Sequence, residues 1–185
     1  KISMLIYAVF LTPWLIEAGM GMLYVESHGY NKSLAGRRWF KANWRPINQY
    51  GYRDAEYDAS KLKEKKVILI VGDSFTAGHG IKNYKDRFSN QLNDLLGEEW
   101  AVLNIAQCGW NTTNQIDALR QNPCANLSPT IVILAYYVND IESAANLHDM
   151  KFSQSPSQQP HWLVKPFVNH SALFNWVFWK CSTVY

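Results

Sequence analysis

Cysteine is scarce in this sequence, and none of it falls in a metal-binding or redox pattern. Cys108, Cys124 and Cys181 are widely spaced, with no C-x-x-C pair and no Cys/His cluster at metal-ligand spacing. This excludes the common cysteine-based zinc modules, and we expect no metal site. Free, buried thiols are the simplest interpretation of the three residues, and a single disulfide is the alternative if the domain is exported.

The chain also lacks a strong excess of charge of either sign. Lys and Arg number 18 against 15 Asp and Glu, and the longest basic run, "KLKEKK", is interrupted by Glu64. Nucleic-acid binding needs a concentrated basic patch, so we expect no nucleic-acid partner. A hydrophobic content of 48% excludes general disorder, and 185 residues leave room for one domain and a small appendage.

One long apolar run is present, at the start of the chain. Residues 2–25 read "ISMLIYAVFLTPWLIEAGMGMLYV" and are interrupted only by Pro13 and Glu17. This is about the length that a membrane-spanning helix needs, although a carboxylate in mid-bilayer is unfavourable. We predict a membrane anchor or signal-like helix over residues 1–26, and the alternative is a core or interfacial helix. No convincing small-residue cleavage site follows, so an anchor is favoured over a removed signal peptide. The basic residues after the run would place the following domain in the cytoplasm by the positive-inside rule, but a long translocated domain weakens that rule.

The middle of the chain alternates between strand-like and helix-like segments. Strands are predicted in "KVILIVGD", "AVLNIAQCGW" and "PTIVILAYYVNDI", with helices in "DRFSNQLNDLLGEEW" and "NTTNQIDALRQNP" between them. This order is typical of an α/β fold, a three-layer α/β/α sandwich with a parallel sheet. Ligands bind at the carboxyl ends of such strands, where this sequence places Gly72-Asp73-Ser74, Gln107-Cys108-Gly109 and Asn139-Asp140.

Three familiar glycine motifs do not account for "GDSFTAGHG". It lacks the G-x-G-x-x-G pattern of dinucleotide-binding folds, and His79 stands where a phosphate-binding loop has lysine. Thr76 replaces the second glycine of a G-x-S-x-G nucleophile elbow. We therefore expect no nucleotide or other cofactor.

The stretch "VILIVGDSFTAGHGI" resembles the first block of the SGNH hydrolases, also called GDSL-type esterases and lipases. "VLNIAQCGWNTTNQ" and "IVILAYYVND" resemble the second and third blocks of this family, in the same order. "INQYGYRDAEY" looks like a short lead-in strand of its membrane-anchored or exported bacterial members. The resemblance implies a flavodoxin-like sheet preceded by a hydrophobic helix, with a connector at 27–64 and a hydrolase domain from 65 to 185.

The resemblance also implies roles for individual residues. Ser74 matches the nucleophile, and the N–H groups of Ser74 and Gly109 with the side-chain amide of Asn139 match the oxyanion donors. A hydroxyl that attacks an ester carbonyl needs such donors around the developing negative charge. Asp73, Asp140 and Thr76 are expected to support this site.

Two features depart from the family pattern. Tyr137 stands where the third block often has glycine, and it is expected to narrow the acyl pocket. The general base of the family is a histidine in a late D-x-x-H block, and no aspartate here is followed by histidine three residues later. We expect this block and the final strands beyond Tyr185, which would leave the present segment inactive; the alternative is an inactive member. His79 is interpreted as a polar residue of a loop, and not as the base.

The sequence therefore predicts a serine ester hydrolase that acts through an acyl-serine intermediate on a small ester or an acylated carbohydrate. The resemblance leaves two alternatives, an O-acyltransferase acting on cell-envelope polysaccharide and a non-catalytic binding module with the same fold. It also implies a membrane-anchored protein on the periplasmic or extracellular face of a bacterium.

Overall fold

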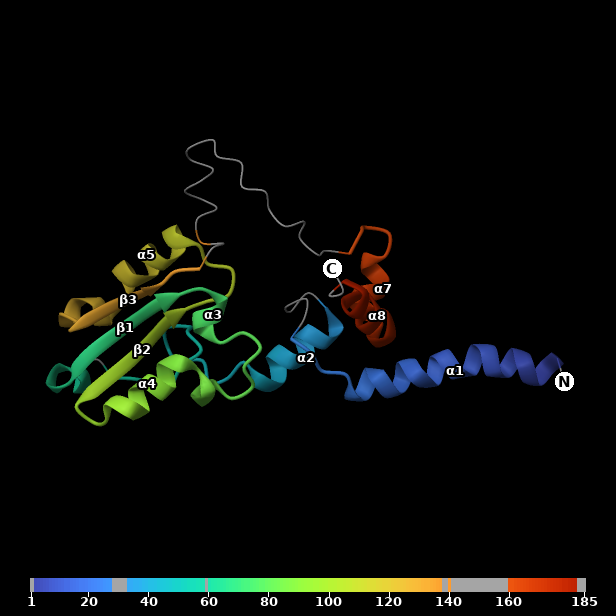
Figure 1. Cartoon of the computed structure of the whole chain (residues 1–185), viewed down its shortest axis with the longest axis horizontal. Helices are drawn as coiled ribbons and strands as arrows, with labels where there is room; N and C mark the ends of the chain where they lie inside the picture. Colours follow the sequence, from blue (N-terminus) through green and yellow to red (C-terminus); the bar gives the residue numbers. More distant parts are fainter. Residues whose placement is uncertain (1, 28–32, 59, 138–139, 141–159, 183–185) are drawn as a thin grey trace, which may run out of the picture. The chain divides into compact units, whose positions relative to one another are not determined.

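The computed structural model describes residues 2–27, 33–58, 60–137, 140 and 160–182. It divides into two compact units (Figure 1). The sheet unit comprises Asn43–Ser153, and the helical unit comprises Lys1–Ala42 together with Gln154–Tyr185.

Three parallel strands form the centre of the sheet unit. They are β1 (Lys66–Gly72), β2 (Trp100–Ala106) and β3 (Ile131–Ala135), in the spatial order β2-β1-β3. At the carboxyl ends, Gly72 lies opposite both Ala106 and Ala135. The central strand is buried from Val67 to Gly72, as its run of β-branched residues predicts for a strand covered on both faces.

Helices cover both faces of this sheet. α4 (Phe88–Leu96) follows β1 and α5 (Thr112–Gln121) follows β2, and they lie on opposite sides of the sheet (Figure 1). Right-handed crossovers to either side of a central strand require this arrangement. The main core packs Leu69, Ile105 and Ala118 with their neighbours. The predicted α/β fold, with a parallel sheet between helices, is confirmed.

The helix boundaries follow local rules. α4 ends at Gly97, which has a φ of 77°, a conformation that glycine adopts without strain. α5 begins with a reciprocal capping box between Asn111 and Asn114. The shorter helices of this unit are α3 (Ser74–Ala77), η2 (Lys61–Glu64), η3 (Tyr84–Asp86) and η4 (Pro123–Leu127).

The short lead-in strand predicted before β1 does not form in the described residues of the connector. The Asn48 side chain accepts hydrogen bonds from the N–H groups of Tyr50 and Tyr52, at 3.1 and 3.0 Å. Gly51, with a φ of 86°, closes this turn by donating to the Asn48 carbonyl. Because these backbone groups are satisfied locally, the segment turns instead of extending.

The described part of the helical unit contains the helices α1 (Ile2–Leu23), α2 (Leu34–Asn43), α7 (Lys165–His170) and α8 (Ala172–Ser182). Within the part of the chain that the structure describes, no helix combines the length and the apolar character needed to cross a membrane. The anchor predicted for residues 1–26 gains no support from this helix.

Candidate active site

Ser74 lies in a tight turn directly after the central strand. β1 ends at Gly72, and the buried Asp73 caps α3 by accepting the Phe75 N–H at 2.9 Å. Ser74 is the first residue of that helix and is 9% exposed. Its hydroxyl donates to Asp73 Oδ2 at 3.4 Å. The turn therefore holds one hydroxyl at the carboxyl end of the sheet, with a carboxylate beside it.

Glycine is required at position 72 because another side chain occupies the space beside it. A Cβ atom there would lie 2.1 Å from Thr76 Oγ1 and 3.2 Å from the Ala135 carbonyl oxygen. Thr76 is 1% exposed and has no room to move away. The predicted supporting residue Thr76 thus folds back over the end of β1 and fixes the turn that carries Ser74.

Replacing Gly72 by alanine is expected to lower the free energy of unfolding by about 1–3 kcal/mol, the usual cost of overpacking a filled core. Urea denaturation of the purified protein measures this effect. Gly21→Ala is the matched control, because a Cβ atom at Gly21 meets nothing within 4 Å. Equal stability of the two variants would contradict the close packing of Thr76 on Gly72.

A buried arginine binds the chain that follows the Ser74 turn. Arg53 is 1% exposed, and its guanidinium donates to a fan of backbone carbonyls: Gly78 at 2.6 Å, Ile81 at 2.7 Å, Asn43 at 2.9 Å, Lys82 at 3.1 Å and Ala77 at 3.4 Å. Burial and the neighbouring Arg87 lower the pKa of Arg53 to about 10, so the group remains charged at neutral pH. It fixes the chain that leaves α3.

A second buried network joins this arginine to the sheet. Arg87 donates to the Arg53 carbonyl and, at 2.9 Å, to the Asp54 carboxylate. Asp54 accepts the Asn104 N–H at 3.0 Å, and the Asn104 side chain donates to the Thr76 carbonyl at 2.8 Å. These bonds connect the segment before β1, the start of α4, strand β2 and α3, so that the Ser74 turn is tied to each of them.

The loop after β2 lies beside the Ser74 turn. Because Gly72 and Ala106 are paired, Ser74 and Gly109 follow neighbouring strands at the same edge of the sheet. Gly109 has a φ of 83° within an exposed turn. Burial, with a further contribution from the Asp73 carboxylate, raises the pKa of the adjacent Cys108 thiol to about 12. Cys108 therefore stays protonated at neutral pH and is a poor nucleophile.

The segment after β3 is the third loop at the carboxyl end of the sheet. Asp140 is fully buried, its carboxylate accepts the Tyr137 N–H at 2.8 Å, and its own N–H donates to the Tyr137 carbonyl at 2.9 Å. Thr112, at the start of α5, donates its hydroxyl to the Asp140 carbonyl at 3.0 Å. The Phe75 and Tyr137 rings lie 4.2 Å apart between centroids. These contacts bring the three strand-end loops together.

The predicted site residues are therefore placed as follows. Asp73, Ser74 and Thr76 share one turn, and Gly109 and Asp140 lie in the two flanking loops. Asn139, the predicted side-chain oxyanion donor, lies outside the described residues. Among the described residues, no group of three His, Cys, Asp or Glu side chains is arranged to hold a metal ion.

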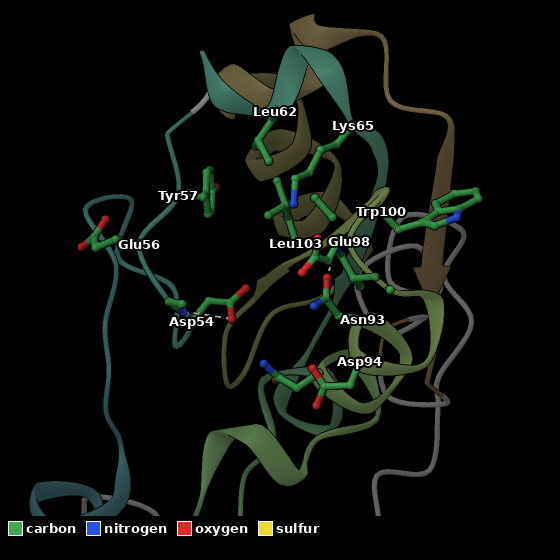
Figure 2. A pocket seen from close by; sticks show the side chains of 15 residues that line it. Asp54, Glu56, Tyr57, Leu62, Lys65, Asn93, Asp94, Glu98, Trp100 and Leu103 are labelled. Carbon is green, nitrogen blue, oxygen red and sulfur yellow. Dashed lines mark hydrogen bonds between the residues drawn. The ribbon is translucent and has the colours of Figure 1, made fainter.

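A hollow of about 450 Å³ elsewhere in the sheet unit is separate from this site. It lies along the amino-terminal half of β2, and none of the predicted site residues lines it. Figure 2 shows the Asp54 and Asn93 side chains facing it. They accept the outward N–H groups of Asn104 and Val102 at 3.0 Å each. The two side chains therefore provide hydrogen-bond acceptors for N–H groups on the outer edge of β2.

Comparison with known proteins gives one match. A model of the GDSL-like lipase/acylhydrolase family matches residues 70–161, a segment that runs from the end of β1 past all three loops. No curated protein and no solved structure matches significantly.

Proposed function

Because the chain belongs to the GDSL-like lipase/acylhydrolase family, we propose that it removes acyl groups from esters by way of the Ser74 hydroxyl. The observation that carries this proposal is the placement of Ser74. It is a nearly buried hydroxyl in a rigid turn at the carboxyl end of the central strand, flanked by loops from both neighbouring strands.

In this reaction Ser74 Oγ adds to the ester carbonyl carbon and passes its proton to a base. The tetrahedral intermediate collapses by breaking the bond to the alkoxide, which takes up a proton and leaves. Water or a second hydroxyl-bearing compound then adds to the acyl carbon and gives up its proton. The bond between that carbon and Ser74 Oγ breaks, the acyl group leaves on the acceptor oxygen, and Oγ regains a proton. The N–H groups of Ser74 and Gly109, together with the Asn139 amide, are proposed to stabilise the oxyanion in both steps. Loss of one such donor typically costs about 10²–10³ in turnover.

The base that takes the Ser74 proton is proposed to be a histidine, as the family resemblance implies. Asp73 contacts the Ser74 hydroxyl, but the same carboxylate is committed to the Phe75 N–H. Its role is to hold the turn. A histidine whose pKa lies near neutrality is better matched to taking the serine proton.

The acyl group is proposed to be small. The Phe75 ring, whose residue directly follows Ser74 in the chain, lies 4.2 Å from the Tyr137 ring between centroids, and the two residues are 63% and 42% exposed. We propose that this pair limits the space beside the Ser74 hydroxyl more than a glycine at position 137 would. An acetyl group fits such a site better than a long fatty-acyl chain. The acceptor is water in an esterase and a sugar hydroxyl in the alternative O-acetyltransferase.

The test is to incubate the full-length protein with an aryl acetate and to search for an acetyl adduct by mass spectrometry. We expect the adduct on the peptide that contains Ser74, and faster release of the aryl alcohol from acetate than from a long-chain ester. The reason for this expected preference is that the Phe75 and Tyr137 rings are proposed to limit the space for the acyl group. Adding an oligosaccharide acceptor then separates transfer from hydrolysis. An adduct confined to other residues, or none at all, would contradict the proposal.

A further inference from the structure

The helical unit exposes a large apolar and aromatic surface. Side chains from α1, α7 and α8, and from the segment before α7, contribute to it, among them Trp14, Trp162, Phe167, Phe174 and Trp176, which are 40–71% exposed. Single exposed apolar residues are common, but contiguous apolar patches mark a binding surface. Tryptophan and phenylalanine are favoured where a protein meets the headgroup region of a bilayer.

The carboxylate of α1, Glu17, is hydrogen-bonded and so does not add an unpaired charge to this apolar surface. Glu17 accepts hydrogen bonds from the Ser171 hydroxyl at 2.7 Å and from the N–H groups of Ala172 and Leu173 at 2.7 and 3.0 Å. It therefore caps the first turn of α8 from another helix. Burial opposes ionisation, but these bonds and Arg38 hold the pKa of Glu17 below its usual value.

A groove of about 820 Å³ lies between α1 and the α7–α8 pair. Its walls are mostly apolar, built from Pro13, Trp14, Phe167, Leu173 and Phe174, and Glu17 and Ser171 also line it. An apolar groove of this volume can accommodate part of a hydrocarbon chain.

The charge of the protein is unequally divided between the two units. Residues 1–42 and 154–185 contain seven lysines and arginines but only two carboxylates, a surplus of five. The sheet unit, by contrast, contains eleven basic residues and thirteen acidic ones. The apolar surface thus belongs to the basic unit. This combination is complementary to anionic phospholipid, in which a negative surface overlies a hydrocarbon interior.

We propose that the helical unit docks on the surface of an anionic phospholipid bilayer. The aromatic side chains of α1, α7 and α8 enter the headgroup region, an acyl chain occupies the groove, and the basic residues contact lipid phosphates. Binding of this kind lies in the plane of the interface and needs no membrane-spanning helix. It is independent of the chemistry at Ser74.

The experiment is flotation of the full-length protein with two kinds of vesicle, phosphatidylcholine alone and phosphatidylcholine with about one third phosphatidylglycerol. We expect flotation with the anionic vesicles and a loss of it at high salt. Lys165→Gln is expected to weaken binding roughly fivefold, the equivalent of about 1 kcal/mol for one basic residue near an anionic surface.

The apolar contribution is tested with the double variant Trp162→Ser/Phe167→Ser. It should lower the bound fraction by at least about tenfold, since each aromatic side chain buries a large apolar area on insertion. Leu95→Ser is the matched control, because Leu95 is 84% exposed but lies on α4 of the sheet unit. Circular dichroism checks that every variant is folded. The proposal is overturned if folded protein ignores both vesicles, binds both equally, loses as much binding with Leu95→Ser, or covers this surface by pairing with a second copy.

Discussion

Replacing Ser74 by alanine is expected to abolish covalent labelling of the full-length protein by a fluorophosphonate probe. The probe reacts with an activated serine hydroxyl and stays attached to it, so loss of Oγ removes the bonding atom itself. The labelling rate should fall by at least about a thousandfold, because serine and its base act as a unit. Ester turnover should fall with it.

The control for this experiment is Ser60→Ala. Ser60 is an exposed serine of the same unit whose hydroxyl donates to Asp58 at 2.7 Å. It lies near η2, before β1, and it should not affect labelling. Cys108, whose thiol is affected by the Asp73 carboxylate of the turn, is held protonated by burial and is not expected to compete with Ser74. Undiminished labelling of Ser74→Ala would remove this serine as the nucleophile.

The order of strands and helices along the chain could be predicted from the sequence, and so could the strand ends at which polar residues gather, because both depend on local sequence. A β-branched run followed by Gly72 and Asp73 specifies a buried strand that stops abruptly, and three such runs separated by helices leave few possible topologies. The register, with Gly72 opposite Ala106 and Ala135, then brings Ser74 beside the two flanking loops. The family resemblance added the role of each residue, which periodicity alone does not supply.

The residues that hold the Ser74 turn were missed, because their importance depends on distant partners. Arg53 and Asp54 read as part of a polar connector, and charged residues are usually exposed. In the folded chain they are 1% and 6% exposed and bind groups far along the sequence, Gly78 and Asn104 among them. The only local signal is an Arg-Asp pair preceded by aromatic residues, which is too common to be diagnostic.

Glu17 is a second residue whose role could not be predicted, because its partners are also distant in the sequence. In the sequence it appears as an unfavourable charge within an apolar helix. Its partners, Ser171, Ala172 and Leu173, lie about 155 residues further along the chain. No local pattern predicts that a carboxylate on one helix will cap another.

Removing the Asp54 carboxylate is expected to be the most destabilising single change in the sheet unit. Asp54→Ala leaves the Arg87 guanidinium, which is 1% exposed, without its counter-charge and removes the acceptor of the Asn104 N–H. Breaking a buried ion pair at one partner costs about 3–5 kcal/mol. Because Asn104 also holds the Thr76 carbonyl, the Ser74 turn should loosen, and fluorophosphonate labelling should slow in protein that is still folded.

Native-state hydrogen exchange of the β1 amides measures this cost within the sheet unit alone. Asp117→Ala is the matched control, since Asp117 and Arg120 form an ion pair at 3.7 Å with both side chains at least half exposed. Exposed pairs contribute at most about 1 kcal/mol, so this change should be small. Asp54→Asn, which keeps an oxygen acceptor but no charge, should fall between the two. If Asp54→Ala and Asp117→Ala had equal effects, the buried carboxylate would not be what ties the Ser74 turn to the sheet.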